Sequence, residues 1–302
     1  MTQLIISIIS SSLRSSVPLI LAATGGAFSS RAGVSDLGLE GMMLGGAFFA
    51  VWGSHLTGSP WMGLLFGAAF GVLFSMLHAV MHISYRVNAS ISGMCVNLLA
   101  TAVTPLLLNF FYGLNGKSVT VNGFGKINSA LLEKIPFIGR ILNSQSILFY
   151  LTIAVVILGW VFMYRTTPGL RMRMVSENPQ AASTVGLNVT AYKYFGVAMS
   201  GAFSGLGGAY LSLSQMNMFV ENMTNGRGYI AVVINAFGHY NPLGAMFGSL
   251  FFGFFDSLQT VFQGVLPSHL VMMTPYVFTL VVLIFGMKRG KAPAGIGKHV
   301  ES

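Results

Sequence analysis

Charged residues are scarce in this chain. Only 8% of its 302 residues are Asp, Glu, Lys or Arg, whereas 54% are hydrophobic, and the mean hydropathy is +0.72. A soluble domain carries roughly a quarter charged residues, so this composition excludes a soluble globular protein and predicts a polytopic membrane protein. The net charge of +9 comes from cations in loops and the C-terminal tail. Such cations set membrane orientation and meet anionic lipid headgroups, and they do not indicate nucleic-acid binding.

Sequence motifs of catalysis are also missing. The chain has one cysteine, Cys95, and therefore no disulfide framework. It contains no P-loop, no HExxH and no GxSxG motif. His78 and His82 form the one pair at helical spacing, and packing explains that pair more simply than a metal does. We therefore expect no catalytic residue, no metal site and no cofactor in this chain.

Apolar segments separated by polar turns predict an all-α protein with about eight to ten transmembrane helices. After a short apolar segment at 17–28, the expected spans are 37–56, 61–85, 88–111, 147–164, 191–213, an interrupted span at 215–238, 243–262 and 269–285. Lys and Arg gather in the loop at 165–190 and in the C-terminal tail, so the positive-inside rule places both in the cytoplasm. The Gly- and Asn-rich loop at 112–145 then lies outside.

Two segments are interrupted by small and polar residues. Residues 25–41 read GGAFSSRAGVSDLGLEG, and residues 222–238 read NMTNGRGYIAVVINAFG. Such residues are tolerated at membrane depth where they face protein or a wet cavity. We expect broken helices beside a translocation route, with 38–46 facing 222–235 across it. The candidate route residues are Glu40, Asn88, Asn97, Asn222, Arg227, Tyr229 and Asn235.

Other roles for these polar residues stay open. Glu40 could serve as an interfacial helix cap, and the amides could hydrogen-bond between helices. Arg227 could extend to the outer interface, or it could pair with Glu40 or Glu221 as a gate.

An internal repeat relates the two ends of the chain. The sequence GGA at 25–27 recurs at 207–209, and Ser59-Pro60 corresponds to Asn241-Pro242; both pairs are 182 residues apart (207 minus 25, and 242 minus 60). The repeat predicts halves at about 9–111 and 191–287 within a single permease domain, 1–302. An odd number of spans separates the copies, so the second copy is inverted in the membrane. Inverted repeats with broken helices are typical of transporters.

The polar loop at 165–190 carries its own helix signals. Asn178 is a good N-cap, Pro179 suits the first helical position, and Gly186 suits the end. The pattern predicts a short cytoplasmic helix between two spans. Such a helix is suited to contact with a cytosolic partner.

Three motifs together resemble a known family. GGAFSSRAGVSDLGLEGMMLGGAFFA, TTPGLRMRMVSENPQAASTVGLNV and NMTNGRGYIAVVINAFGHYNPLGA are similar to the inner-membrane permease subunits of bacterial ABC importers. The branch is the one for ribose, branched-chain amino acids and nucleosides. The forms GLEGMM and GRGYIA are most similar to nucleoside-uptake permeases. His239-Tyr240 departs from the Arg-Trp or similar pair that many relatives carry.

The resemblance implies a type II-like importer fold and a set of partners. These are a cytosolic ATPase that binds ATP and Mg, a second related permease in a heterodimer, an external substrate-binding lipoprotein, a nucleoside substrate and membrane lipid. It places the chain in the bacterial inner membrane with a cytoplasmic C-terminus. It also assigns coupling to the ATPase to Glu177, Asn178, Pro179, Gln180, Ala181, Ala182 and Gly186.

Two alternatives remain at this stage. The same machine could carry ribose or another simple sugar. A secondary transporter driven by an ion gradient is the second alternative, and it would favour intramembrane carboxylates. Few are present: Glu40, Asp256 and Asp36.

Overall fold

A computed structural model describes residues 2–125, 138–262 and 292–298, and these are helical throughout apart from loops and one isolated bridge between Lys117 and Val220. The helices are α1 (Thr2–Arg31), α2 (Leu39–Thr57), α3 (Pro60–Ala79), η1 (Val80–Ser84), α4 (Ala89–Tyr112), α6 (Ile138–Asn143), α7 (Ile147–Arg165), α8 (Thr167–Glu177), α9 (Pro179–Thr184), α10 (Val189–Tyr210), η2 (Leu211–Met216), α11 (Arg227–Phe237) and α12 (Pro242–Phe262). The all-α prediction is confirmed for this part of the chain.

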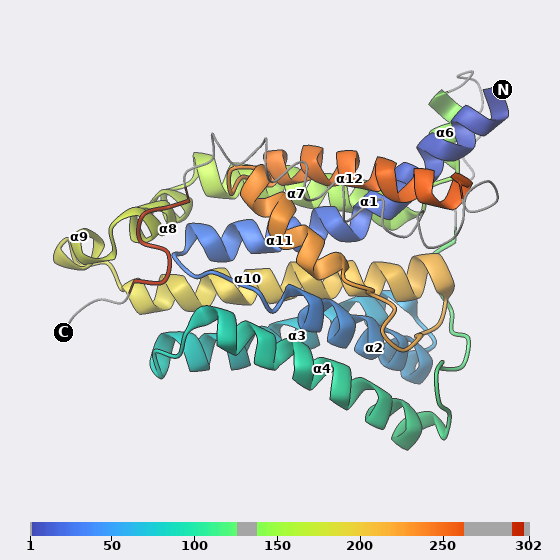
Figure 1. The fold of residues 1–302 in the computed structure, drawn as a ribbon, viewed down its shortest axis with the longest axis horizontal. Helices are drawn as coiled ribbons and strands as arrows, with labels where there is room; N and C mark the ends of the chain where they lie inside the picture. Colours follow the sequence, from blue (N-terminus) through green and yellow to red (C-terminus); the bar gives the residue numbers. More distant parts are fainter. Residues whose placement is uncertain (1, 126–137, 263–291, 299–302) are drawn as a thin grey trace.

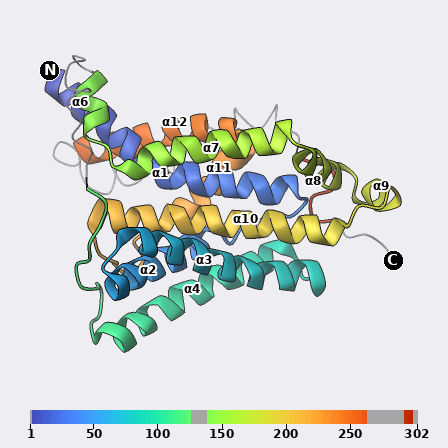
Figure 2. The same cartoon turned by 180° about the vertical axis from the view of Figure 1, so that it is seen from behind.

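The long helices lie side by side in one elongated bundle (Figures 1 and 2). α8 and α9 project from one end, whereas α6 and the N-terminus lie at the opposite end. Within the described ranges, four segments are long and apolar enough to cross a membrane: Ile5–Arg31, Pro60–Ser84, Ala89–Tyr112 and Ile147–Arg165. The predicted span at 269–285 lies outside the described residues.

α1 and α10 form the centre of the bundle and run in opposite directions. A Cβ at Gly25 would lie 2.7 Å from the Ser200 carbonyl oxygen, and a Cβ at Gly207 would lie 3.0 Å from that of Pro18. The partner residue number falls as the α10 number rises, so the two helices are antiparallel. Glycine at these positions lets the two backbones approach closely, which stabilises helix pairs in lipid.

The third helix of each repeat half packs on the first helix of the other half. α3 packs on α10, where Gly71 leaves no room for a Cβ against the Gly201 carbonyl. α12 packs on α1, where a Cβ at Gly253 would lie 2.7 Å from the Ser12 carbonyl oxygen. Gly71 and Gly253 are 182 residues apart, the offset of the sequence repeat. The antiparallel first helices and the matched third helices confirm the inverted arrangement.

The helix breaks are shorter than the sequence predicts. α1 continues through Gly25 to Arg31, so the predicted break at 25–41 is wrong in its first part, and the chain leaves the helix only at 32–38. Ser29 Oγ donates to the Gly26 carbonyl at 3.3 Å, so this hydroxyl is satisfied inside the helix. The second break is likewise limited to 217–226, because α11 is helical from Arg227 onward.

Candidate functional site

The N-termini of α2 and α11 meet inside the bundle at Glu40. This residue lies in the first turn of α2 and is 7% exposed. Its Oε1 accepts hydrogen bonds from Thr224 Oγ1 at 2.5 Å and from Gly226 N at 2.9 Å, and its Oε2 accepts one from Gly228 N at 2.6 Å. Backbone N–H groups at a helix start have no partner in their own helix. The Glu40 carboxylate therefore caps α11 from a different helix.

Asn97 on α4 holds the break between α1 and α2. Its Oδ1 accepts from Gly41 N at 2.8 Å, and its Nδ2 donates to the Leu37 carbonyl at 2.8 Å. The same Nδ2 donates to the Tyr229 hydroxyl at 3.1 Å. One buried amide thus satisfies a backbone carbonyl of the break and a backbone N–H in the first turn of α2, and it also reaches α11. Of the predicted route residues, the structure brings Glu40, Asn97 and Tyr229 together.

The remaining amides lie elsewhere. Asn235, 5% exposed, donates from Nδ2 to Ser30 Oγ at 3.1 Å and lies about two turns along α11 from Tyr229. Asn88 caps α4 by accepting from Ser90 N at 2.9 Å. Asn222 is exposed, with φ of 55°, in the segment before α11. The sequence predicts that 38–46 and 222–235 face each other. In the structure Glu40 lies against 224–228, whereas Gly46 packs against Gly205 of α10.

Arg227 has a different partner from those the sequence suggested. Its Nη2 lies 3.7 Å from Asp256 Oδ2 of α12, and its Nη1 donates to the Met223 carbonyl at 3.3 Å. The predicted pairing with Glu40 or Glu221 is wrong. Both Glu40 oxygens are occupied, and Glu221 Oε1 accepts from Gly116 N at 2.8 Å. Asp256 could have been found from the sequence, because a carboxylate in a membrane helix needs a cationic partner.

Sequence reasoning also missed the role of Asp36. Its Oδ2 accepts from Ser200 Oγ at 2.6 Å, and its Oδ1 accepts from Gly38 N at 2.9 Å. The first break is therefore bonded to α10 as well as to α4. An acid inside a glycine-rich interruption was the available signal.

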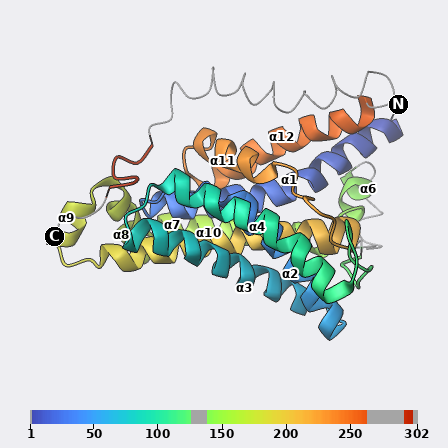
Figure 3. The same cartoon turned by 60° about the horizontal axis from the view of Figure 1, so that its bottom comes forward.

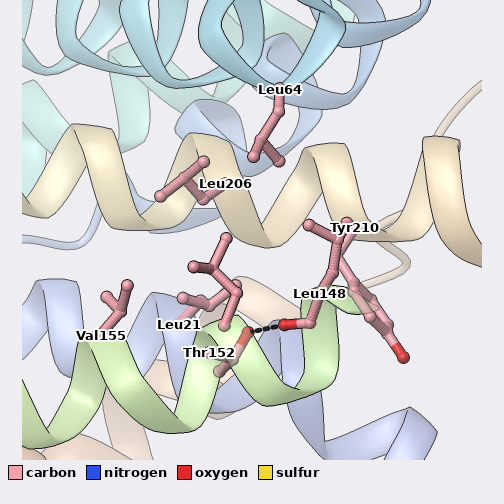
Figure 4. A pocket seen from close by; sticks show the side chains of 8 residues that line it. Leu21, Leu64, Leu148, Thr152, Val155, Leu206 and Tyr210 are labelled. Carbon is pink, nitrogen blue, oxygen red and sulfur yellow. Dashed lines mark hydrogen bonds between the residues drawn. The ribbon is translucent and has the colours of Figure 1, made fainter. Parts of the chain in front are cut away.

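A small cavity lies between α1, α3, α7 and α10 (Figure 4). It measures about 20 Å³ and is lined almost entirely by aliphatic side chains, so it has room for about one water-sized sphere. The one hydroxyl drawn bonded there, Thr152 Oγ1, donates to the Leu148 carbonyl of its own helix at 2.8 Å. This cavity is too small and too apolar to hold a hydrogen-bonding solute.

The predicted cytoplasmic helix is present as α9. Asn178 Oδ1 accepts from Ala181 N at 3.0 Å, which confirms the N-cap, and Gly186 has the left-handed φ of +80° that ends the turn. Pro179 and Ala182 are buried, however, and Ala182 packs in a cluster with Val175 of α8. These two residues hold α9 onto α8 and do not face outward.

The outward face of α9 combines Gln180, which the sequence predicts for coupling, with Ser183 and Thr184, which the sequence prediction missed. Gln180, Ser183 and Thr184 are exposed and share one face, since they are spaced at i, i+3 and i+4. Val185, just after the helix, is 64% exposed. That helical spacing was the signal that could have separated these residues from the buried pair.

Comparison with known proteins identifies the family. Residues 8–287 match the family described as "Branched-chain amino acid transport system / permease component". The nucleoside ABC transporter permease protein NupC of Lactococcus lactis is 41% identical over 96% of this chain and 95% of its own length. The guanosine ABC transporter permease protein NupQ of Bacillus subtilis is 36% identical over 98% of this chain and 96% of its own length. A putative glucose ABC transporter permease protein, TsgC13 of Haloferax volcanii, is 34% identical over 83% of this chain and 76% of its own length.

The bundle, its broken helices and this match agree with one another. They replace the ion-coupled secondary transporter as an interpretation, and they make the chain a transport subunit and not an enzyme. The chain belongs to the permease component family of branched-chain amino acid transport systems and is a multi-pass membrane permease subunit of an ABC importer.

Proposed function

We propose that this chain forms, together with a second and related permease, the pathway of an importer for nucleosides. The observation that carries the proposal is the identity to NupC and NupQ, two permeases named for nucleosides and guanosine, over nearly the whole chain.

The chemistry of the broken-helix region supports a neutral, hydrogen-bonding substrate. Tyr229 is 49% exposed on α11, and its hydroxyl is already oriented by Asn97. Asn222 is exposed in the segment just before the same helix. An aromatic ring next to amides suits a nucleobase and a ribose. We also propose that the substrate pathway includes Glu40, Asn88, Arg227 and Asn235.

Exposed segments at the two ends of the bundle support two docking partners. A cytosolic ABC ATPase, which binds ATP and Mg, docks on the outward face of α9. An external binding lipoprotein docks at the opposite end, where the loop that begins at 112 pairs with the second break: Ser118 N donates to the Phe219 carbonyl and Glu221 N to the Gly116 carbonyl, both at 2.9 Å. Residues 292–298 pack beside α8, and this contact supports a C-terminus on the same, cytoplasmic side as the coupling loop.

A simple sugar is the second candidate substrate. The Haloferax relative, named as a putative glucose permease, is 34% identical to this chain. A sugar and a nucleoside share hydroxyl groups, so the hydrogen-bonding residues suit both. A flat nucleobase offers the larger stacking surface to the Tyr229 ring.

The test is uptake by the purified complex. The chain is tagged, co-purified with its ATPase and second permease, and reconstituted in proteoliposomes with the binding lipoprotein outside and ATP inside. We expect ATP-dependent uptake of labelled guanosine or adenosine, with no inhibition by unlabelled ribose or glucose in large excess. Uptake must also be unaffected by ionophores.

Two other results of the uptake experiment would change the interpretation. Uptake that ribose or glucose blocks, with no uptake of nucleosides, would keep the machine and change the substrate to a sugar. Failure of any ATPase to co-purify, with uptake that follows an ion gradient, would contradict the proposal as a whole.

A further inference from the structure

Arg31, the last residue of α1, contacts two other segments at the cytoplasmic end of the bundle. Its Nε donates to the Tyr240 carbonyl and its Nη2 to the His239 carbonyl, both at 2.9 Å. Its Nη1 lies 3.8 Å from Glu177 Oε1, the last residue of α8. The rigid guanidinium fork can bind several acceptors at once, which a lysine cannot do with the same geometry.

The corner between α11 and α12 has an unusual backbone that fits this contact. His239 and Tyr240 both have φ of 56°, a left-handed conformation that residues with a Cβ rarely adopt in succession. Tyr240 N donates to the Asn235 carbonyl at 3.0 Å and closes the end of α11. The two carbonyls of this corner are the ones that Arg31 binds. Burial raises the pKa of the Tyr240 phenol, and the nearby positive charge of Arg31 opposes that shift.

The C-terminal tail ties α1 to α8 by backbone bonds. Gly297 N donates to the Gly33 carbonyl at 3.0 Å, and Gly295 N donates to the Ser176 carbonyl at 2.8 Å. A Cβ at Gly295 would lie 2.7 Å from the Ser176 oxygen and 2.8 Å from Pro179 Cδ, so the tail fits closely between α8 and α9. The end of α1 is thus held to the base of α9, and Arg31 extends from that unit to α11.

α11 connects this corner to the broken-helix region. It has 11 residues and is therefore about 16 Å long. Its far end begins at Arg227, and Gly228 N is bound there by Glu40. A displacement of the corner at 239–240 therefore reaches the Glu40 contact through one short helix with no break inside it.

We propose that Arg31 is a positioning residue of the transport cycle, which carries movement of α9 to α11 through its bonds to Glu177 and to the His239 and Tyr240 carbonyls. The proposal rests on the proposed function, because it requires an ATPase that docks on α9. In this proposal Arg31 takes no direct part in substrate binding or in ATP hydrolysis. It acts in the step that links the two.

The experiment measures substrate uptake and ATP hydrolysis in the same proteoliposomes of the full complex, with labelled guanosine as the probe. Arg31→Gln is compared with wild type, with Arg31→Lys, and with Arg86→Gln as the matched control. Arg86 is an exposed arginine that follows η1 and lies outside the coupling segment. We expect Arg31→Gln to keep the ATPase bound and ATP hydrolysis near wild type, while guanosine transported per ATP falls about tenfold. Arg31→Lys recovers part of this ratio, and Arg86→Gln leaves it unchanged.

A second variant guards against a folding defect. Glu177 is 57% exposed in its side chain, so Glu177→Gln leaves the bundle packing intact. We expect it to lower the same ratio, by less than Arg31→Gln does, with the ATPase still co-purifying. The proposal is overturned if Glu177→Gln and Arg31→Gln leave the ratio at the wild-type value, or if uptake and hydrolysis fall in parallel. Absence of the ATPase from the wild-type complex would instead contradict the proposed function, a result that the co-purification step reports separately.

Discussion

The first break, residues 32–38, is mostly buried and bonded to neighbouring helices, whereas the second break, residues 217–226, is longer and partly exposed. Asp36 and Asn97 hold the first break through side-chain hydrogen bonds to α10 and α4. In the second break, Asn217, Asn222 and Asn225 all have positive φ, and the backbone pairs with the loop segment 116–121. Figure 3 shows the second break as a coil that leads into α11.

From this difference we expect α11, and not α2, to be the helix that moves more readily. The first break is fixed from two sides inside the bundle, so α2 is anchored. The second break is attached to the 116–121 segment at one end and to the Glu40 carboxylate at the other. Backbone hydrogen bonds therefore connect the 116–121 segment to the chain that leads into α11, and Glu40 is the point where the two broken helices share an interaction.

Removal of the Glu40 carboxylate gives the largest expected effect. Glu40→Ala leaves the Thr224 hydroxyl and the N–H groups of Gly226 and Gly228 without their acceptor. An unpaired buried donor costs about 1–3 kcal/mol, so the loss is about 3 kcal/mol or more in total. We expect the variant to insert poorly, to show a lower apparent melting temperature in detergent, and to lose guanosine uptake.

Glu40→Gln is the matched control for this prediction. The amide keeps the shape and one acceptor oxygen, so we expect a decrease of intermediate size. If Glu40→Ala melts and transports like wild type, the two broken helices do not depend on their shared cap.

The sequence and physical rules account for most of the fold. Apolar segment lengths predicted α2, α3, α4, α7 and α12 to within a few residues, and Asn178 with Pro179 predicted the start of α9. Local patterns suffice for these elements because a helix in lipid must satisfy its own backbone.

The partners of the buried polar side chains could not be predicted in the same way. Arg227 bonds to Asp256, and Glu40 bonds to Gly228, a residue 188 positions away. Such contacts depend on how antiparallel helices dock in three dimensions. With the offset of 182 residues, Gly46 corresponds to Gly228, but the two glycines have different neighbours: Gly46 contacts Gly205, and Gly228 contacts Glu40. Repeat symmetry predicts topology and not residue contacts.

Replacement of Asn97 tests the first break and gives the next largest effect. Asn97→Leu leaves Gly41 N and the Leu37 carbonyl unpaired, at a cost of about 2 kcal/mol. Tyr229→Phe removes only the bond to α11, so we expect a cost of about 1 kcal/mol or less. Apparent melting temperatures of both variants give the comparison. Equal losses would mean that the bond across to α11, and not the anchoring of the first break, is what Asn97 contributes.

Thr101→Val is the control for Asn97. Thr101 lies one turn further along α4, and its hydroxyl donates to the Asn97 carbonyl of the same helix at 2.9 Å. We expect a change within about 0.5 kcal/mol, as is usual for substitutions away from buried networks.

The smallest expected effect concerns the backbone of the second break. Asn225 has φ of 45° and an exposed side chain, and Asn tolerates this region better than Ala does. Asn225→Ala costs up to about 1 kcal/mol because Ala keeps the Cβ but loses the short polar side chain that lets Asn adopt this conformation, and Asn225→Gly is close to neutral because relief of strain offsets the greater freedom of the unfolded chain. In the first break, Gly33 has φ of +87°. Gly33→Ala adds a Cβ in this conformation and costs about 1–2 kcal/mol. Guanosine uptake separates the two sites: we expect Asn225→Ala to lower the uptake rate more than Gly33→Ala does, whereas Gly33→Ala has the larger effect on the melting temperature. Equal uptake rates for both variants would remove the distinction between an anchored and a movable break.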